Sequence, residues 1–133
     1  MARRSSVLHE IAERRAADIA AELGGRTLRD VMPEAAGGPA RREVAGRFAR
    51  AGLHLIAEIK RSSPSAGSMV DRELDVAERA RAYQAGGASM ISVLVEPHWF
   101  GGSLDDLRVA RAATTLPVLA KESVVDERQL PLL

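Results

Sequence analysis

Charged side chains stand where apolar segments of the sequence end. Glu58 and Lys60 close the first such segment, and Lys121 follows the third. Side chains alternate along a strand, so Glu58 and Lys60 are expected on the same face of a sheet. Burying charge is costly unless the charge is paired or used, so this group favours a binding or catalytic site over mere packing. The alternative is a surface role, with Glu58 paired to Lys60 and both lysines solvated.

Lysine at a strand end is also the nucleophile of Schiff-base aldolases, so that enzyme class stays open at this stage. Trp99 and Phe100 lie together in the loop after the second apolar segment. They are either an apolar wall for an aromatic ligand or anchors that hold the loop down. His98 beside them is interpreted as a solvated residue.

Other kinds of site find no support in the sequence. His9 and His54 have no partner at metal-ligand spacing, so we expect no metal site. Neither a Gly-x-Gly-x-x-Gly nor a P-loop motif occurs, which argues against nucleotide cofactors. The formal net charge of +1 gives no electrostatic reason to expect nucleic acid or a membrane surface as a partner. The chain has no cysteine, which excludes disulfides and thiolate chemistry.

The elements that must position these groups alternate along the chain. Helical periodicity with flanking glycines predicts a first helix over residues 6–23. A Gly- and Pro-rich stretch over residues 26–40 predicts a connection with one irregular turn at most. The remaining elements are a short helix (42–50), strands (53–59, 89–95 and 117–120), helices (71–84 and 103–113) and the start of a helix at Asp126.

Strands that are apolar on both faces and alternate with helices indicate a parallel sheet covered by helices. Either a doubly wound open sheet or a (β/α)₈ barrel fits this order. Ligands of both architectures bind at the carboxyl ends of the strands, where Glu58, Lys60 and Lys121 lie. No apolar run approaches the ~20 residues of a membrane-spanning helix, and no targeting signal is present, so the cytoplasm is the expected location.

Three blocks of sequence resemble the indole-3-glycerol phosphate synthase family. The first is the Glu-x-Lys-x-x-Ser-Pro-Ser element that runs from Glu58 to Ser65. The second includes Phe100-Gly101-Gly102-Ser103, and the third includes Leu116-Pro117-Val118-Leu119 and Lys121. Their order and spacing match the family over about residues 42–130.

The resemblance implies a (β/α)₈ barrel preceded by an N-terminal helical extension. Residues 1–52 would be the extension, and residues 53–133 would be the first three βα units of an incomplete barrel. It implies a carboxy-lyase of tryptophan biosynthesis that uses no cofactor or metal. The substrate, a phosphorylated aromatic amine, is 1-(2-carboxyphenylamino)-1-deoxyribulose 5-phosphate. Ring closure, decarboxylation and dehydration convert it to indole-3-glycerol phosphate.

The resemblance also implies a role for individual residues. Lys121 matches the general acid that protonates the substrate carbonyl, and Lys60 matches the lysine that contacts the substrate carboxylate. Glu58 matches the acid that positions the two lysines. Three further positions match substrate contacts: Ser63, Pro64 and Phe100. A lysine in a crowded cationic site has a lowered pKa, so it can release a proton near neutral pH.

Two departures from the family pattern qualify this interpretation. Glu122-Ser123 stands where the family usually has Asp-Phe, which removes an apolar wall beside Lys121. A full barrel needs ~250 residues, and three strands cannot close one. We therefore expect a truncated synthase that does not turn over substrate alone and exposes an apolar, unpaired sheet edge. A complementing half-barrel is a candidate partner. The alternatives are a non-catalytic barrel remnant that pairs with another chain, and a Schiff-base aldolase-type barrel.

Overall fold

The computed structural model describes residues 6–69 and 73–133. The chain forms two compact units. One unit comprises Arg41–Glu122 and contains the sheet. The other combines the segment that ends at Ala40 with Ser123–Leu133.

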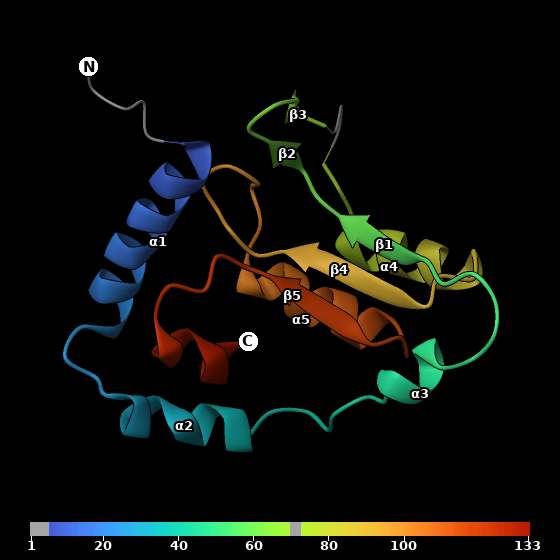
Figure 1. The fold of residues 1–133 in the computed structure, drawn as a ribbon, viewed down its shortest axis with the longest axis horizontal. Coiled ribbons are helices and arrows are strands. Elements are labelled where there is room, and N and C mark those ends of the chain that lie inside the picture. Colours follow the sequence, from blue (N-terminus) through green and yellow to red (C-terminus); the bar gives the residue numbers. More distant parts are fainter. Residues whose placement is uncertain (1–5, 70–72) are drawn as a thin grey trace. The chain divides into compact units, whose positions relative to one another are not determined.

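A parallel sheet of three strands is the centre of the first unit (Figure 1). Its strands are β1 (Ile56–Ile59), β4 (Met90–Leu94) and β5 (Val118–Lys121), in the order β1-β4-β5. Both pairings are parallel, so all three carboxyl ends lie at one edge of the sheet. The prediction of a mixed α/β fold with a parallel sheet is confirmed.

Two helices cover one face of this sheet (Figure 1). These are α4 (Val76–Ala85), which follows β1, and α5 (Leu104–Ala113), which follows β4. Each begins at a side-chain cap that accepts a backbone N–H: Asp75 from Glu78 and Ser103 from Asp106. The helix predicted from Asp71 begins later, at Val76, and Asp71 itself lies outside the described residues.

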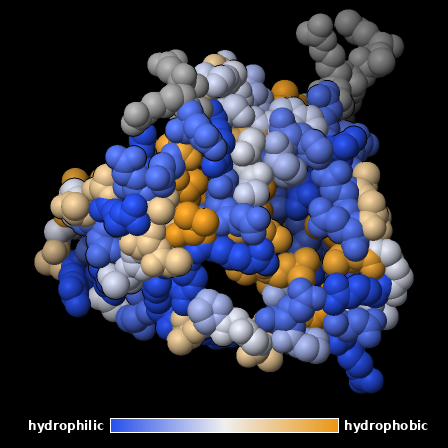
Figure 2. All heavy atoms as spheres, turned by 180° about the vertical axis from the view of Figure 1, so that it is seen from behind, coloured by the Kyte–Doolittle hydropathy of each residue, from blue (hydrophilic) through white to orange (hydrophobic). Residues whose placement is uncertain are grey.

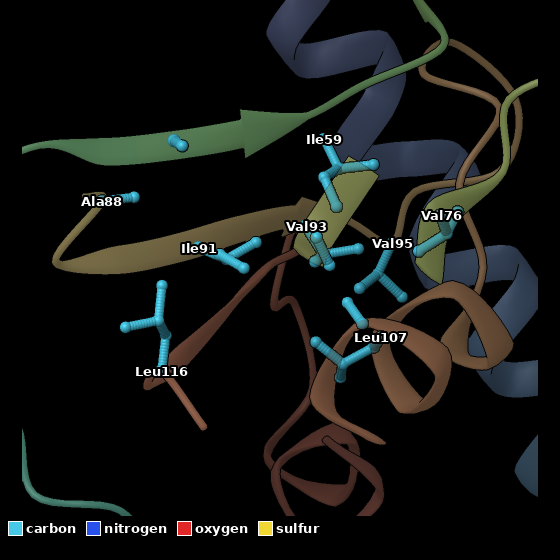
Figure 3. Close-up of a cluster of buried hydrophobic side chains, with 11 residues drawn as sticks. Ile59, Val76, Ala88, Ile91, Val93, Val95, Leu107 and Leu116 are labelled. Atoms are coloured by element: carbon cyan, nitrogen blue, oxygen red, sulfur yellow. The ribbon is translucent and has the colours of Figure 1, made fainter. Parts of the chain in front are cut away.

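The register separates the two faces of the sheet. On the helix-covered face, Ala57 of β1 pairs with Ile91 of β4, and Ile59 pairs with Val93. These side chains join Leu107 and others from both helices in one buried cluster (Figure 3). The opposite face carries a different set of side chains: Glu58, Ser92, Leu94, Leu119 and Lys121. Core packing on one face therefore fixes which side chains remain for chemistry on the other.

Two short elements flank the sheet within this unit. Helix α3 (Ala45–Phe48) precedes β1, within the short helix predicted over residues 42–50. A small antiparallel ladder, β2 (Ser62–Ser63) with β3 (Gly67–Ser68), follows β1. This ladder was not predicted, because two-residue strands leave no alternating pattern in the sequence.

The second unit is helical. Helix α1 (Val7–Leu23) is capped by Ser6, in agreement with the helix predicted over residues 6–23. Helix α2 covers Leu28–Ala36, and a 3₁₀ helix, η1, covers Glu127–Leu132. The chain therefore does begin a helical segment after Asp126, although it is a 3₁₀ helix.

The prediction of a mere connection over residues 26–40 is wrong, because α2 lies within it. Thr27 and Asp30 form a capping box at its start, which satisfies backbone N–H groups that would otherwise lack partners. Val31 is fully buried against Ile19 and Leu23 of α1. Capping and packing thus outweigh Pro33, which costs the helix one backbone hydrogen bond.

Apolar side chains also reach the surface, as the orange patches of Figure 2 show. Around the outer strands they include Leu53, Leu55, Ile56 and Leu119, each at least two-fifths exposed. Both β1 and β5 are outer strands of the described sheet. No helix within the described residues is long and apolar enough to cross a membrane.

Candidate active site

Three charged side chains converge at the carboxyl edge of the sheet, on the face that α4 and α5 leave open. The Glu58 carboxylate accepts a hydrogen bond from Lys121 Nζ through Oε2 at 2.8 Å. Lys60 Nζ lies 3.2 Å from the other oxygen, Oε1. The structure therefore brings together the carboxylate and the two ammonium groups that the sequence singled out.

Solvent reaches these groups only in part. The side chains of Glu58 and Lys60 are each 28% exposed, and that of Lys121 is 56% exposed. Burial raises the pKa of the Glu58 carboxyl, but hydrogen bonds and charge from Lys121 and Lys60 together hold its pKa below the ordinary value. Glu58 is thus an anion that binds one ammonium group at each of its two oxygens.

The two cations of the site are both lysines. The nineteen basic residues of the chain include two lysines, Lys60 and Lys121, and all the others are arginines. An ammonium can rotate its donors and release a proton, whereas a guanidinium stays charged. The residue type at the site is therefore the one suited to proton transfer.

Strand β4 runs between the residues of this site. Ser92 pairs in register with Glu58 on one side and Leu119 on the other. It is buried, and its hydroxyl lies 3.5 Å from Glu58 Oε2. A small side chain at this position leaves room for Glu58 and Lys121 to meet.

A third contact fixes β1 from the side of α4. The Tyr83 hydroxyl donates to the backbone carbonyl of Glu58 at 2.9 Å. A pocket of about 310 Å³ opens here, lined by Glu58, Ile59, Lys60, Met69, Leu74, Arg79 and Tyr83. Tyr83 was not predicted from the sequence as part of this site.

The loop after β4 carries the aromatic residues and is held close to β1. The Phe100 carbonyl accepts a hydrogen bond from Ser62 N at 3.3 Å, and the Trp99 carbonyl accepts one from Ser62 Oγ at 2.9 Å. Trp99 and Phe100 are both partly buried. Phe100 is thus tied to the chain two residues beyond Lys60.

An ion pair braces the same region. The Arg61 guanidinium binds both carboxylate oxygens of Asp106, on the first turn of α5. This bidentate contact joins the end of β1 to the helix that follows β4.

Ser63 and Pro64 lie further along, in the β2–β3 segment. Ser63 Oγ accepts a hydrogen bond from Ala66 N at 3.1 Å, so this hydroxyl organises its own turn. Pro64 is exposed within that turn. Both residues follow the carboxyl end of β1 in the chain, and their contact with a substrate stays a prediction.

Over residues 6–69 and 73–133, no three His, Asp or Glu side chains are grouped so that they could hold a metal ion. What the arrangement offers is a paired carboxylate, two ammonium donors and a neighbouring aromatic loop. Such a group can bind an anion and donate a proton.

Comparisons with known proteins identify a family and relatives of this chain. A family model described as indole-3-glycerol phosphate synthase matches residues 8–132. Relatives of that name are 44% identical over 126 residues in Mycobacterium avium and 41% over 126 residues in Mycobacterium tuberculosis. Each alignment covers 95% of this chain and 46% of the relative. One from Exiguobacterium is 56% identical over 79 residues, 59% of this chain and 31% of the relative. The chain spans about half the length of the curated relatives it matches.

Proposed function

Because this chain belongs to the indole-3-glycerol phosphate synthase family, we propose that it supplies the catalytic lysines of that reaction. The substrate would be 1-(2-carboxyphenylamino)-1-deoxyribulose 5-phosphate. Ring closure, loss of CO₂ and loss of water convert it to indole-3-glycerol phosphate. The observation that carries the proposal is the convergence of Lys60 and Lys121 on the Glu58 carboxylate.

Lys121 is the general acid in this proposal. The substrate ketone must gain a proton on its oxygen as the aryl carbon attacks the carbonyl carbon. An ammonium at the carboxyl end of β5 can supply that proton, and general acid catalysis of this kind contributes ~10²–10⁴-fold. The hydrogen bond to Glu58 holds the Lys121 amine in place before substrate arrives.

Lys60 binds the substrate carboxylate until CO₂ leaves. Its Nζ lies on the opposite oxygen of Glu58 from Lys121, so the carboxylate keeps the two ammonium groups at separate positions. One can therefore contact the ring carboxylate while the other faces the ketone. Glu58 acts as a positioning residue for both.

Phe100 would pack against the aromatic ring, and Ser63 and Pro64 would line the same rim. The hydrogen bond between Phe100 and Ser62 supports this placement, because it ties the aromatic loop to the end of β1. Aromatic side chains pack on aromatic ligands in offset or edge-to-face geometry.

We further propose that the sheet is the first part of a (β/α)₈ barrel. In the described sheet, β1 and β5 are the outer strands, and exposed apolar side chains such as Ile56 and Leu119 lie on them. Polypeptide equivalent to the remainder of the relatives would pair with these strands. The phosphate of the substrate would be bound there, as phosphate sites in such barrels follow the last strands.

The test combines this chain with the complementary portion of the Mycobacterium avium relative and follows the formation of indole-3-glycerol phosphate by the fluorescence of its indole ring. We expect no product from the chain alone and measurable product from the pair. Lys121→Ala should lower kcat by ~10²–10⁴-fold with a smaller change in KM. Arg108→Ala, at an exposed ion pair on α5, is the matched control and should leave the rate unchanged.

Either of two results would contradict the proposal. If the pair folds but forms no product from this substrate, the chain does not take part in the proposed reaction. A Lys121→Ala pair with near-normal kcat would remove Lys121 from the chemistry. Trapping of a covalent substrate adduct by borohydride at Lys60 or Lys121 would instead identify Schiff-base chemistry, and both sites are easily mapped because the chain has no other lysine.

A further inference from the structure

The most deeply buried acid of the described chain lies outside the lysine site. Glu96, two residues beyond the end of β4, is 1% exposed. Burying a carboxylate is costly unless it is paired or fully hydrogen-bonded. The residues that follow it in the sequence, Pro97, His98 and Trp99, include no lysine or arginine that could form an ion pair with its carboxylate.

The partners of the Glu96 carboxylate are backbone N–H groups of the aromatic loop, the loop after β4 that contains Trp99 and Phe100. Glu96 Oε1 accepts the N–H of His98 at 2.8 Å, and Oε2 accepts the N–H groups of Trp99 at 2.7 Å and Phe100 at 3.1 Å. Three successive amides therefore point at one carboxylate. Hydrogen bonds of this charge-assisted kind are about twice as strong as neutral ones.

Glycines close the loop behind these residues. Gly102 N donates to the Glu96 carbonyl at 3.0 Å. A Cβ on Gly102 would lie 2.0 Å from the Leu94 carbonyl oxygen, so the backbone approach there excludes any side chain. Gly101, with φ of 65°, adopts the left-handed conformation that glycine favours. The loop is thus wrapped around the Glu96 carboxylate.

We infer that Glu96 is the positioning residue that sets Phe100 at the rim of the lysine site. The inference rests on the proposed function, in which Phe100 packs on the aromatic ring of the substrate. Two anchors act in series: Glu96 fixes the three amides, and Ser62 fixes the carbonyls of Trp99 and Phe100. Without the hydrogen bonds to Glu96, the contacts with Ser62 would not by themselves determine the conformation of the loop.

The chemistry of the carboxylate explains why an acid is needed. Glu96 accepts on both oxygens, whereas glutamine would accept on one and present an N–H₂ group to the remaining amides. Glu96→Gln therefore removes at least one hydrogen bond and adds a donor facing a donor. Aspartate is one methylene shorter and would reach the three amides less well.

The first experiment reads the loop itself and needs no substrate. Trp99 is the single tryptophan of the chain, so its emission reports this loop. In Glu96→Gln we expect amide hydrogen exchange at residues 98–100 to rise about tenfold or more, from the loss of a charge-assisted hydrogen bond. Trp99 emission should change while exchange in β4 stays slow. Glu22→Gln, at an exposed position of α1, is the control.

The second experiment tests whether Glu96 acts through Phe100. The probe is 2-aminobenzoate, the aromatic half of the proposed substrate, titrated against the full chain and followed by Trp99 emission. Glu96→Gln should weaken its binding about tenfold, and should have no further effect in a Phe100→Ala background.

Unchanged exchange and emission in Glu96→Gln would overturn the inference, and so would equal losses of affinity in both backgrounds. If the unmodified chain does not bind 2-aminobenzoate at all, the proposed function loses its support. The exchange result still decides whether Glu96 organises the loop, so the two failures are distinguishable.

Discussion

The Glu58 carboxylate and the Lys121 ammonium meet at 2.8 Å although their strands are not neighbours. Strand β4 lies between β1 and β5, and outer strands of such a trio are about 9–10 Å apart. Lys121 pairs in register with Leu94, two residues beyond the Ser92 that pairs with Glu58. The contact therefore crosses β4 diagonally, over a buried serine.

The first prediction concerns the acid sensitivity of this contact. The lysines hold the pKa of Glu58 below 4.5, the ordinary value. A carboxyl whose pKa is depressed on folding contributes stability that is present above its unfolded pKa and is lost as pH falls through the folded pKa. Urea unfolding midpoints should thus decline below about pH 4.5, and less steeply in Glu58→Gln. The idea fails if the urea unfolding midpoints of Glu58→Gln and of the control Glu22→Gln decline equally steeply below about pH 4.5.

The second prediction concerns the strand that the contact crosses. Ser92→Leu places a larger side chain between Glu58 and Lys121 at a buried position. Overpacking of this kind costs about 1–3 kcal/mol, and the two side chains should separate. Ser92→Ala, which removes only the hydroxyl, should keep them together. Mass spectrometry after labelling with an amine reagent measures this directly, because Lys60 and Lys121 are the only lysines.

Faster labelling of Lys121 in Ser92→Leu, with Ser92→Ala close to the unmodified chain, is the expected result. Equal labelling rates in all three proteins would mean that residue 92 does not determine whether Glu58 and Lys121 meet.

Much of this sheet could be predicted from the sequence because apolar strands and their helices leave strong patterns. The alternation along β1 placed Glu58 and Lys60 on one face, and the strand ends placed Lys121 at the same edge. Their contact with one another depends on register and on Ser92, and no local pattern encodes either. Ser63, Pro64 and Phe100 came from the family resemblance, and their contact with substrate stays a prediction.

What the sequence did not indicate depends on contacts between distant residues. Helix α2 was missed because Pro33 within it, and the glycines and proline that follow it at residues 37–39, argue for a loop, while the burial of Val31 against α1 is a tertiary effect. Tyr83 and Glu96 were not assigned roles, since each acts by bonding to backbone atoms of another segment or of its own loop. The division of the chain at residue 52 remains a prediction.

The third prediction concerns the closest backbone approach in the aromatic loop. Gly102→Ala would bring a methyl group to 2.0 Å from the Leu94 carbonyl oxygen, so the backbone must move. We expect a loss of at least about 1–3 kcal/mol in unfolding free energy, together with a change in Trp99 emission. Gly25→Ala is the matched control, because a Cβ there meets no atom within 4 Å. Emission like that of the unmodified chain in Gly102→Ala would show that the loop tolerates the side chain.

The fourth prediction concerns the cap of η1. Hydrogen bonds from the Arg128 side chain, and then from its backbone N–H, lower the pKa of Asp126 to about 2. The sign follows from the depressed pKa: the stabilising contribution is complete above pH 3.8 and is lost as pH falls towards about 2. Asp126→Asn can still cap the helix, since asparagine is as good an N-cap as aspartate, but it removes the ion pair. Protection of the η1 amides, taken relative to the intrinsic exchange rate at each pH, should then be insensitive to pH between 3.8 and 2, whereas in the unmodified chain this protection should fall as Asp126 is protonated. Glu127→Gln, in the first turn of the same helix, should retain that pH dependence, and its loss in this control would assign the effect to the helix as a whole instead of to the Asp126–Arg128 pair.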